Sequence, residues 1–351
     1  MKVKLALLVA GLQVLVLAFM AGQREWITRT GQPVTLRTAP IDPNDPMRGA
    51  YVRLDYEISF VPPTQCRGEI VNWIKLSDYR ETQKLRDRVV YAALSVNAYG
   101  IAELTSLSDT PPATGLFLRG RVVTADTGGV RVRYGIEALF MQKDAAQKME
   151  MMAINDKAGA PMDVTVAVSS SGIAVLKSTT WEPLGLTITP DRPPPRDTSN
   201  PQQRWQPQPI TGMTVTLHNY GDQDLALVIL PDAKSFRMVP NTRFVGDHYA
   251  WVGANSTDRS APAAGDIIVL KPGTKHAVHL DLTQPQWWVT DTRKPGSDPM
   301  PLQKLTEGWA ASFRIEYAPP TADAVKGLLH ADLIRHAPLR SRAFNPNQGV
   351  D

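Results

Sequence analysis

"DPNDPMRGAYVRLDYEIS", residues 42–59, joins a turn to an alternating segment. Two Asp-Pro pairs and Gly49 come first, and the residue before a proline avoids helical backbone angles. The odd positions that follow are mostly polar or charged, whereas the even positions are apolar: Ala50, Val52, Leu54, Tyr56 and Ile58. A period of two with one apolar face is the signature of a half-buried strand. The stretch therefore predicts a strand over residues 50–60 in a β-rich fold.

Strand patterns recur after this stretch at the spacing of hairpins. Residues 70–88, which precede the first predicted hairpin, carry a weak helical pattern. Short apolar or alternating runs that flank Gly- or Asn-containing turns are typical of antiparallel hairpins. Three such pairs are predicted: residues 88–108 around 97–100, 116–141 turning at 126–129, and 163–178 turning near 170–172. We therefore expect a β-rich domain over residues 24–188.

The composition changes at residues 189–209, which are rich in Pro and Gln and poor in apolar side chains. Such a segment predicts an extended linker. Strand patterns return beyond it, and every second side chain of 309–317 is apolar. Short strands at this spacing indicate an immunoglobulin-like β-sandwich over residues 210–339, and 340–351 have the character of a flexible tail. The predicted fold class is all-β, with one helix at the N-terminus.

Residues 1–23 predict that helix, as a membrane anchor. Lys2 and Lys4 precede a run without charge, residues 5–21, and Arg24 closes it. The run has the length of a spanning helix, about 17–25 residues, rather than that of a signal-peptide core, about 7–15. A retained anchor is favoured over a cleaved signal peptide because the candidate cleavage sites lack the small residues required. The two lysines place the N-terminus in the cytoplasm.

These features predict a single-pass protein of a bacterial inner membrane, held in the lipid bilayer by residues 5–21, with its bulk in the periplasm. If the signal were cleaved, the chain would be released into the periplasm. A formal charge of +4 and a pI of about 9.1 weakly favour anionic surfaces. No dense basic run with interleaved aromatic residues indicates nucleic-acid binding.

The sequence carries no recognisable catalytic arrangement. Cys66 is the only cysteine, which excludes an internal disulfide and a cysteine-based zinc site. A Gly-x-Ser-x-Gly nucleophile turn, a phosphate-binding Gly-rich loop and a His-Glu-x-x-His motif are all missing from the sequence. We therefore expect no cofactor and a role other than that of an enzyme.

The first half of the chain resembles the GDYXXLXY protein family. The resemblance rests on four segments, residues 22–59, 116–122 (LFLRGRV), 130–140 (VRVRYGIEALF) and 164–176 (VTVAVSSSGIAVL). The naming motif, preceded by Arg48, falls on Gly49, Tyr51, Leu54 and Tyr56, with Ala50 in place of the family's Asp. The resemblance implies a small membrane-anchored bacterial protein of unknown biochemical role, and it supplies no catalytic residues. Alternation places Leu54 and Tyr56 in the core and turns Tyr51 to the opposite side.

Four arginines are predicted to share one face of the central hairpin: Arg119, Arg121, Arg131 and Arg133. Like charges opposite each other on neighbouring strands are destabilising. Neighbouring acidic side chains, water or a bound anion must compensate these positive charges. The favoured interpretation is a solvated surface with Asp55 and Glu57 as neighbours, because surface charges usually contribute little. The alternative is a face that binds anionic lipid headgroups near the bilayer.

A soft-metal site is the second candidate. Thioethers and imidazole can bind Cu(I), and the candidate ligands are Met149, Met151, Met152 and His276. Alternation places His276 and His279 on opposite faces of one strand, which opposes their sharing an ion. The favoured interpretation is that these methionines fill gaps in the core.

The function predicted from the sequence is a non-enzymatic scaffold or accessory subunit that binds a membrane or envelope protein. The first alternative is a periplasmic protein that handles copper or another metal, and the second is an enzyme of unrecognised type.

Overall fold

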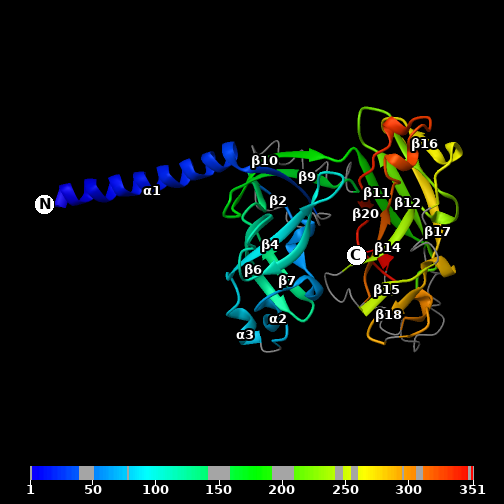
Figure 1. The fold of residues 1–351 in the computed structure, drawn as a ribbon, viewed down its shortest axis with the longest axis horizontal. Coiled ribbons are helices and arrows are strands. Elements are labelled where there is room, and N and C mark those ends of the chain that lie inside the picture. Colours follow the sequence, from blue (N-terminus) through cyan, green and yellow to red (C-terminus); the bar gives the residue numbers. More distant parts are fainter. Residues whose placement is uncertain are drawn as a thin grey trace, which may run out of the picture. The chain divides into compact units, whose positions relative to one another are not determined.

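The computed structural model is built mostly from β-strands, with one long helix at the N-terminus (Figure 1). The predicted all-β character is confirmed. The structure describes residues 2–38, 51–76, 79–140, 159–191, 209–241, 248–253, 260–294, 296–305, 311–346 and 349–350. The backbone alone is described for residues 2–8, 51–53, 79, 140 and 349–350. The chain divides into two compact units: unit 1 holds Met1–Ala39, Ala50–Gln142 and Met162–Thr180, and unit 2 includes Trp181–Asp351.

Helix α1 spans Lys2–Thr30 and therefore continues beyond its predicted end at residue 23. The extension has a local reason, because Glu25 and Arg29 form an ion pair of 2.6 Å one turn apart and Ile27 is buried. The N–H of Gly31 donates to the Ile27 carbonyl at 2.7 Å and closes the helix. Among the described residues, no helix is long and apolar enough to cross a membrane. The predicted membrane-spanning segment is not confirmed.

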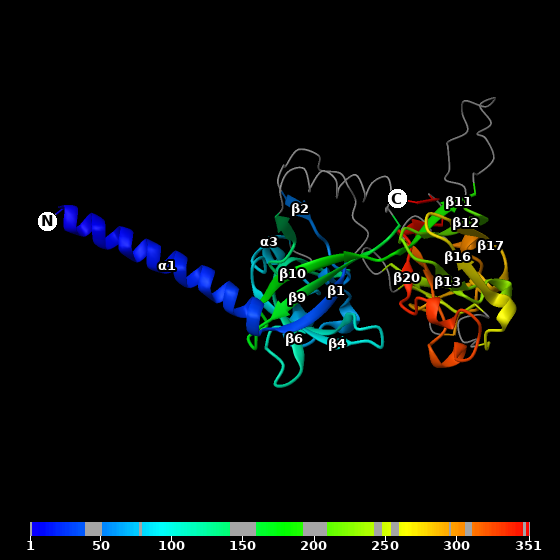
Figure 2. The same cartoon turned by 90° about the horizontal axis from the view of Figure 1, so that it is seen from above.

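The described part of unit 1 contains two sheets and a short strand pair. The five-stranded sheet has the order β3-β7-β6-β4-β5. Its strands are β3 (Phe60–Val61), β4 (Val89–Val96), β5 (Ala102–Ser108), β6 (Leu116–Asp126) and β7 (Gly129–Arg133). The three-stranded sheet, with neighbours in the order β1-β9-β10, comprises β1 (Gln32–Arg37), β9 (Met162–Val168) and β10 (Ala174–Trp181) (Figure 2). The three hairpins predicted from the sequence are thus confirmed.

Smaller elements complete unit 1. Strand β2 (Tyr51–Arg53) pairs with β8 (Ala138–Phe140). The helices α2 (Ile70–Trp73) and α3 (Tyr79–Gln83) lie in the segment with the weak helical pattern. Two 3-10 turns, η1 (Glu57–Ser59) and η2 (Pro63–Gln65), flank β3.

The predicted continuous strand over residues 50–60 is wrong. Strand β2 ends at Arg53, and η1 interrupts the extended backbone before β3 begins at Phe60. The alternation of burial nevertheless holds, because the side chains at even positions are buried: Leu54, Tyr56 and Ile58. Period-two hydrophobicity reports which side chains face the core, but it does not report whether the backbone has a continuous strand partner.

Unit 2 begins earlier than the predicted boundary at residue 188. Strand β11 (Leu184–Pro190) pairs along its whole length with β12 (Gly212–Asn219). On its other edge β12 pairs with β17 (Lys275–Asp281). The predicted linker therefore starts within a strand, and residues 192–208 of it lie outside the described residues. The first part of the predicted linker is structured because Thr189 and Pro190 continue the pairing of β11 with Thr214 and Met213 of β12.

The remaining described strands of unit 2 form two strand pairs and one five-stranded sheet. Strand β13 (Leu225–Val228) pairs with β16 (Ile267–Leu270), and β15 (Tyr249–Trp251) pairs with β18 (Val289–Asp291). The last sheet comprises β14 (Phe236–Pro240), β19 (Phe313–Tyr317), β20 (Leu339–Arg340), β21 (Phe344–Asn345) and β22 (Gly349–Val350). In the described residues, the 3-10 turns between these strands are Pro231–Ala233, Ala264–Asp266, Pro285–Trp287, Leu302–Lys304, Asp323–Val325 and Ala331–Leu333. The predicted immunoglobulin-like sandwich is not confirmed beyond this β architecture.

Asn219 links the two connections by which the chain passes between two sheets of unit 2. The chain passes from β12 to β13 and later from β16 to β17, so both connections leave one sheet for the other. The fully buried Asn219 amide donates to the carbonyls of Gln223 (2.8 Å) and Leu270 (2.9 Å), and its oxygen accepts from the N–H of Gly221 at 2.9 Å. One side chain thereby satisfies backbone groups of both connections.

The described part of the predicted flexible tail is structured. Phe344 is fully buried and packs against Phe313, with ring centroids 6.2 Å apart. The N–H of Ile210 donates to the Pro346 carbonyl at 2.7 Å. The described residues of this segment complete both the apolar core and the last sheet of unit 2.

Candidate functional site

The segments that carry the family resemblance lie side by side in unit 1. In the pairing of β2 with β8, Val52 lies opposite Leu139, and the Leu54 N–H donates to the Glu137 carbonyl at 2.7 Å. The naming motif is therefore held against the YGIE segment, residues 134–137. Arg48 and Gly49 lie outside the described residues, and Tyr51 is described in its backbone alone.

Two buried tyrosines tie these segments together reciprocally. The Tyr56 hydroxyl donates to the Ile136 carbonyl, and the Tyr134 hydroxyl donates to the Ile58 carbonyl, each at 2.8 Å. Burial raises the pKa of both tyrosines, and the Glu137 carboxylate raises it further. Both hydroxyls are therefore protonated donors at neutral pH. We call this pair of contacts the tyrosine clasp.

Glu137 orders the turn inside the clasp. One of its carboxylate oxygens accepts from the Gly135 N–H at 2.9 Å, and the other accepts from the Tyr134 N–H. Gly135 has a φ of +81°, a conformation that glycine adopts without steric cost. The Glu137 carboxylate is therefore hydrogen-bonded to backbone N–H groups. We interpret the arrangement as one that holds residues 134–137 in place beside the motif.

The four predicted arginines have different surroundings. Arg131 forms an ion pair of 2.8 Å with Asp55, the neighbour that the sequence suggested for this face. Arg121 and Arg133 are direct cross-strand partners on β6 and β7. The register of the two strands shifts by one residue after the next pair, Val122 and Val132, so Arg131 lies opposite Thr124. Whether this face binds an anion stays a prediction.

Asp87, which the sequence analysis did not select, compensates the opposed arginines. Arg121 donates through Nη1 to the Asp87 carbonyl at 2.9 Å, and the Arg133 guanidinium contacts the Asp87 carboxylate. Asp87 has a φ of +65°, and its N–H donates to the Val122 carbonyl at 2.9 Å. One signal in the sequence could have identified it: between Glu81 and Glu103, Asp87 is the only acidic residue.

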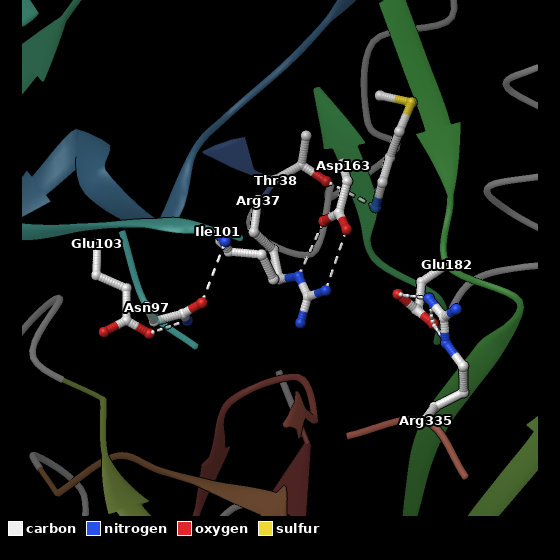
Figure 3. A network of polar contacts seen from close by, with 9 residues as sticks. Arg37, Thr38, Asn97, Ile101, Glu103, Asp163, Glu182 and Arg335 are labelled. Atoms are coloured by element: carbon white, nitrogen blue, oxygen red, sulfur yellow. Dashed lines mark hydrogen bonds and ion pairs between the residues drawn. The ribbon is translucent and has the colours of Figure 1, made fainter. Parts of the chain in front are cut away.

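A buried ion pair links β1 to β9 in unit 1 (Figure 3). Arg37 is 7% exposed, and it donates from Nε and Nη2 to the two Asp163 oxygens at 2.9 and 3.2 Å. Beside it, the Thr38 hydroxyl oxygen accepts from the Met162 N–H at 3.0 Å. Two-point contact between guanidinium and carboxylate fixes geometry as well as charge. We interpret the pair as a positioning contact for the sheet.

Figure 3 also draws two other polar contacts, each within its own unit. In unit 1, Asn97 donates to Glu103 at 2.8 Å and accepts from the Ile101 N–H at 3.1 Å, which closes the β4–β5 turn. In unit 2, the buried Glu182 accepts from Arg335 Nε and Nη2 at 2.9 and 3.0 Å. Both contacts stabilise connections between strands.

The metal candidates are not brought together in the described residues. His276 and His279 lie on opposite faces of β17, as alternation predicts: His276 is opposite Leu217, and His279 faces Asp191, with its Nε2 3.1 Å from a carboxylate oxygen. Where side chains are described, no group of three or more His, Cys, Asp or Glu residues could hold an ion. Three proposed ligands lie outside the described residues: Met149, Met151 and Met152.

Cys66 is buried, and its thiol is protonated at neutral pH. Its residue surface is 2% exposed, and burial raises the pKa of the thiol to about 11. The nucleophile in cysteine chemistry is the thiolate. Cys66 is therefore a core residue of unit 1.

Comparison with known proteins places the family segments in a wider group. Residues 13–178 match the sequence model of the family described as GDYXXLXY protein. Neither curated proteins nor solved structures gave a significant match to the chain. The matched range includes both partners of the tyrosine clasp and the arginines of β6 and β7. The match over residues 13–178 confirms the predicted resemblance of this part of the chain to the GDYXXLXY protein family.

Proposed function

We propose that the chain is a membrane-anchored, non-enzymatic scaffold or accessory subunit of the bacterial inner membrane. Its two β units project into the periplasm and contact a membrane or envelope protein. Unit 2, as an immunoglobulin-like binding module, supplies part of this contact. The proposal combines the uncharged N-terminal run with the family likeness of unit 1.

The observation that supports it most directly is the exposure of helix α1. Large apolar side chains project from all sides of its described part: Val9, Leu12, Val14, Leu15, Val16, Leu17, Phe19 and Met20 are 45–69% exposed. An all-round apolar helix needs an apolar environment, because each buried large side chain gains roughly 1.5–3 kcal/mol. In the sequence the uncharged run covers residues 5–21, and the structure describes its side chains from Val9 onward.

The C-terminal end of α1 supports a rigid attachment to unit 1. Ile27 is buried, and a Cβ placed on Gly31 would lie 3.1 Å from the Ala167 Cβ and the Val168 nitrogen of β9. No extended linker separates the helix from β1, which begins at Gln32. An anchor attached in this way would restrict the orientations of unit 1 at the membrane surface, as suits a scaffold.

Carbonate extraction of bacterial membranes tests the anchor. The full-length chain should stay in the pellet, whereas Leu15→Arg/Leu17→Arg should release it, since each arginine at a helix centre costs about 2.5–3.5 kcal/mol of insertion. The matched control is Val96→Arg/Leu329→Arg, which changes two exposed apolar residues of the β units. Extraction of the unmodified chain, or retention of the α1 variant, would refute the anchor.

Protease treatment of spheroplasts tests the compartment, and co-purification from detergent-solubilised membranes tests the partner. In the protease experiment, we expect both units to be digested before lysis. In the co-purification, we expect one stoichiometric companion protein. Survival of the units until lysis would contradict the periplasmic location. The metal-handling alternative has no supporting cluster in the described residues.

A further inference from the structure

Strand β17 leaves one edge of a unit 2 sheet open. The sheet has the order β11-β12-β17, so β17 pairs with β12 on one side only (Figure 1). The strand has seven residues, no proline and no shift of register. Proteins commonly protect sheet edges with prolines, bulges or very short strands, and β17 has none of these. The side chains at its odd positions are exposed: Lys275, Ala277, His279 and Asp281.

The edge strand β5 of unit 1 is covered, in contrast. The Arg67 N–H donates to the Leu107 carbonyl at 2.8 Å. The Gln65 side-chain amide donates to the Leu104 carbonyl at 3.2 Å. A neighbouring segment of the same chain thus satisfies two carbonyls of β5, so this edge is closed to another strand at these positions.

The backbone groups at the odd positions of β17 point away from β12. Next to the first residue of β17, the Thr274 carbonyl accepts from the Asn219 N–H at 3.0 Å. After its last residue, the Leu282 N–H donates to the Thr211 carbonyl at 2.9 Å. The even positions therefore face β12, and alternation turns the odd positions outward. Among the described residues, nothing bonds to the backbone groups at three outward positions: Lys275, Ala277 and His279.

The sequence of β17, KHAVHLD, is complementary to itself in antiparallel orientation. A two-fold axis through Val278 sets Lys275 of each copy opposite Asp281 of the other. The same axis opposes Ala277 and His279, so outward backbone groups meet outward backbone groups in hydrogen-bonded pairs. Opposite charges directly across two strands stabilise their pairing.

Other registers lose this match. An axis through Ala277 sets Lys275 opposite His279, and an axis through His279 sets Lys275 opposite Thr283. The pKa of the Asp281 carboxyl lies below its ordinary value, because the Thr283 and Gln284 side chains donate hydrogen bonds to it. Asp281 is therefore charged at neutral pH, as the pairing with Lys275 requires.

From these observations we propose that two copies of the chain associate by antiparallel pairing of their β17 strands about Val278. The three-stranded sheets of the two copies then form one continuous sheet. A two-fold contact of this kind uses the same surface on both copies and closes at the dimer. The inference concerns unit 2 and does not depend on the proposed membrane anchor. Under the proposed scaffold function, the dimer presents two copies of each unit.

A cysteine on the proposed axis tests the contact in the full-length chain. Position 278 forms a pair that is not hydrogen-bonded, in which opposed Cα atoms lie about 4.5 Å apart. This separation permits a disulfide. Val278→Cys should therefore cross-link two chains in detergent solution with oxidised glutathione. The control is the unmodified chain, whose buried Cys66 has a protonated thiol at neutral pH and should remain uncrosslinked.

Two further cysteines test the register. In a mixture of Ala277→Cys and His279→Cys, the two positions face each other with Cα atoms about 5.5 Å apart. In either variant alone, the cysteine is offset from its own copy by two residues, or about 8 Å, which is beyond disulfide range. We therefore expect dimer from the mixture and little from either variant alone. Both positions are exposed, so this test does not depend on the folding of the Val278 variant.

Two substitutions in the Val278→Cys chain should weaken the contact. Lys275→Glu opposes two pairs of like charges and should slow cross-linking at low chain concentration roughly two- to thirtyfold. The matched control is Lys326→Glu, at an exposed position after the turn Asp323–Val325, and it should leave the rate unchanged. Ala277→Pro removes an outward N–H that β12 does not use and should abolish the cross-link.

The remaining outcomes would overturn the proposal. If Val278→Cys yields no more dimer than the unmodified chain, β17 does not pair with a second copy. Equal yields from the Ala277→Cys and His279→Cys mixture and from each variant alone would show random collision. An equal rate for Lys275→Glu and Lys326→Glu would refute the opposed charges. In whole membranes, a cross-link from position 278 to a different protein instead of a second copy would assign the edge to that protein.

Discussion

Removing the hydroxyls of the tyrosine clasp should destabilise unit 1 without creating a cavity. Tyr56→Phe and Tyr134→Phe each retain the buried ring and delete one hydrogen bond of 2.8 Å to a backbone carbonyl. A buried acceptor left without its donor costs about 1–3 kcal/mol. We expect about 1–2 kcal/mol from each variant, toward the lower half of that range because the ring packing is unchanged.

The double variant provides the sharper expectation. Both hydroxyls join the same two segments, so loss of one contact should weaken the other. Neighbouring residues commonly show interaction free energies of about 0.5–3 kcal/mol, and we expect the double variant to cost less than the sum of the single variants. Leu54→Ala, in contrast, creates a cavity in the same segment and should cost about 2–5 kcal/mol.

Hydrogen exchange at increasing urea, followed by mass spectrometry of peptides from β6 and β7, measures the free energy of opening of unit 1 separately from unit 2. Tyr99→Phe is the control, since Tyr99 is exposed in the β4–β5 turn and should change stability by less than about 0.5 kcal/mol. Losses below that value for both clasp variants would refute the clasp as a stabilising contact.

The same variants make a prediction about alkaline pH. Tyrosine in the unfolded chain ionises near about pH 10, and burial raises the pKa of Tyr56 and Tyr134 in the folded state. The stability linked to this shift is therefore fully present below about pH 10 and is lost as the pH rises above it toward the folded pKa. The double Phe variant should lose less stability than the unmodified chain over that interval. Identical slopes would contradict the linkage.

Three further changes test contacts elsewhere in the chain. Asn219→Ala should cost about 2–4 kcal/mol of unit 2 stability, because it removes three hydrogen bonds from a buried site, and urea unfolding measures the loss. Phe344→Ala should cost about 3–5 kcal/mol in the same assay, whereas a flexible tail would tolerate it. Arg37→Met should cost about 3 kcal/mol by leaving the Asp163 carboxylate without its partner, and the added change Asp163→Leu should restore most of that loss.

The sequence predicts local structure well where the side-chain period is itself the physical cause. Burial alternates along β4 (Val89–Val96) because successive side chains of a strand point to opposite sides of the sheet. The hairpins at 88–108, 116–141 and 163–178 form because their turns are short and contain Gly or Asn. These properties depend on neighbours in sequence, so they are visible without the fold.

The long-range contacts could not be predicted in the same way. Tyr56 and Ile136 are eighty residues apart in sequence, and Arg37 and Asp163 are further apart still. Nothing in the local pattern around Asn219 distinguishes a buried amide from a surface turn residue. Asp87 shows an intermediate case: its isolation among basic residues is visible in the sequence, whereas its contact with Arg121 and Arg133 requires the register of β6 and β7.

The tyrosine clasp also bears on what the family motif means. Leu54, Tyr56 and Tyr134 are buried, and the two tyrosine hydroxyls bind backbone carbonyls of the facing segment. These contacts position chain segments, so the described side chains of the motif, Leu54 and Tyr56, stabilise the fold of unit 1. Under the proposed scaffold function, partner recognition would then depend on exposed surfaces of unit 1 other than the motif and on unit 2, most of which lies beyond the matched residues 13–178. Chains that share the motif but differ at these surfaces should accordingly share the fold of unit 1 and bind different partners.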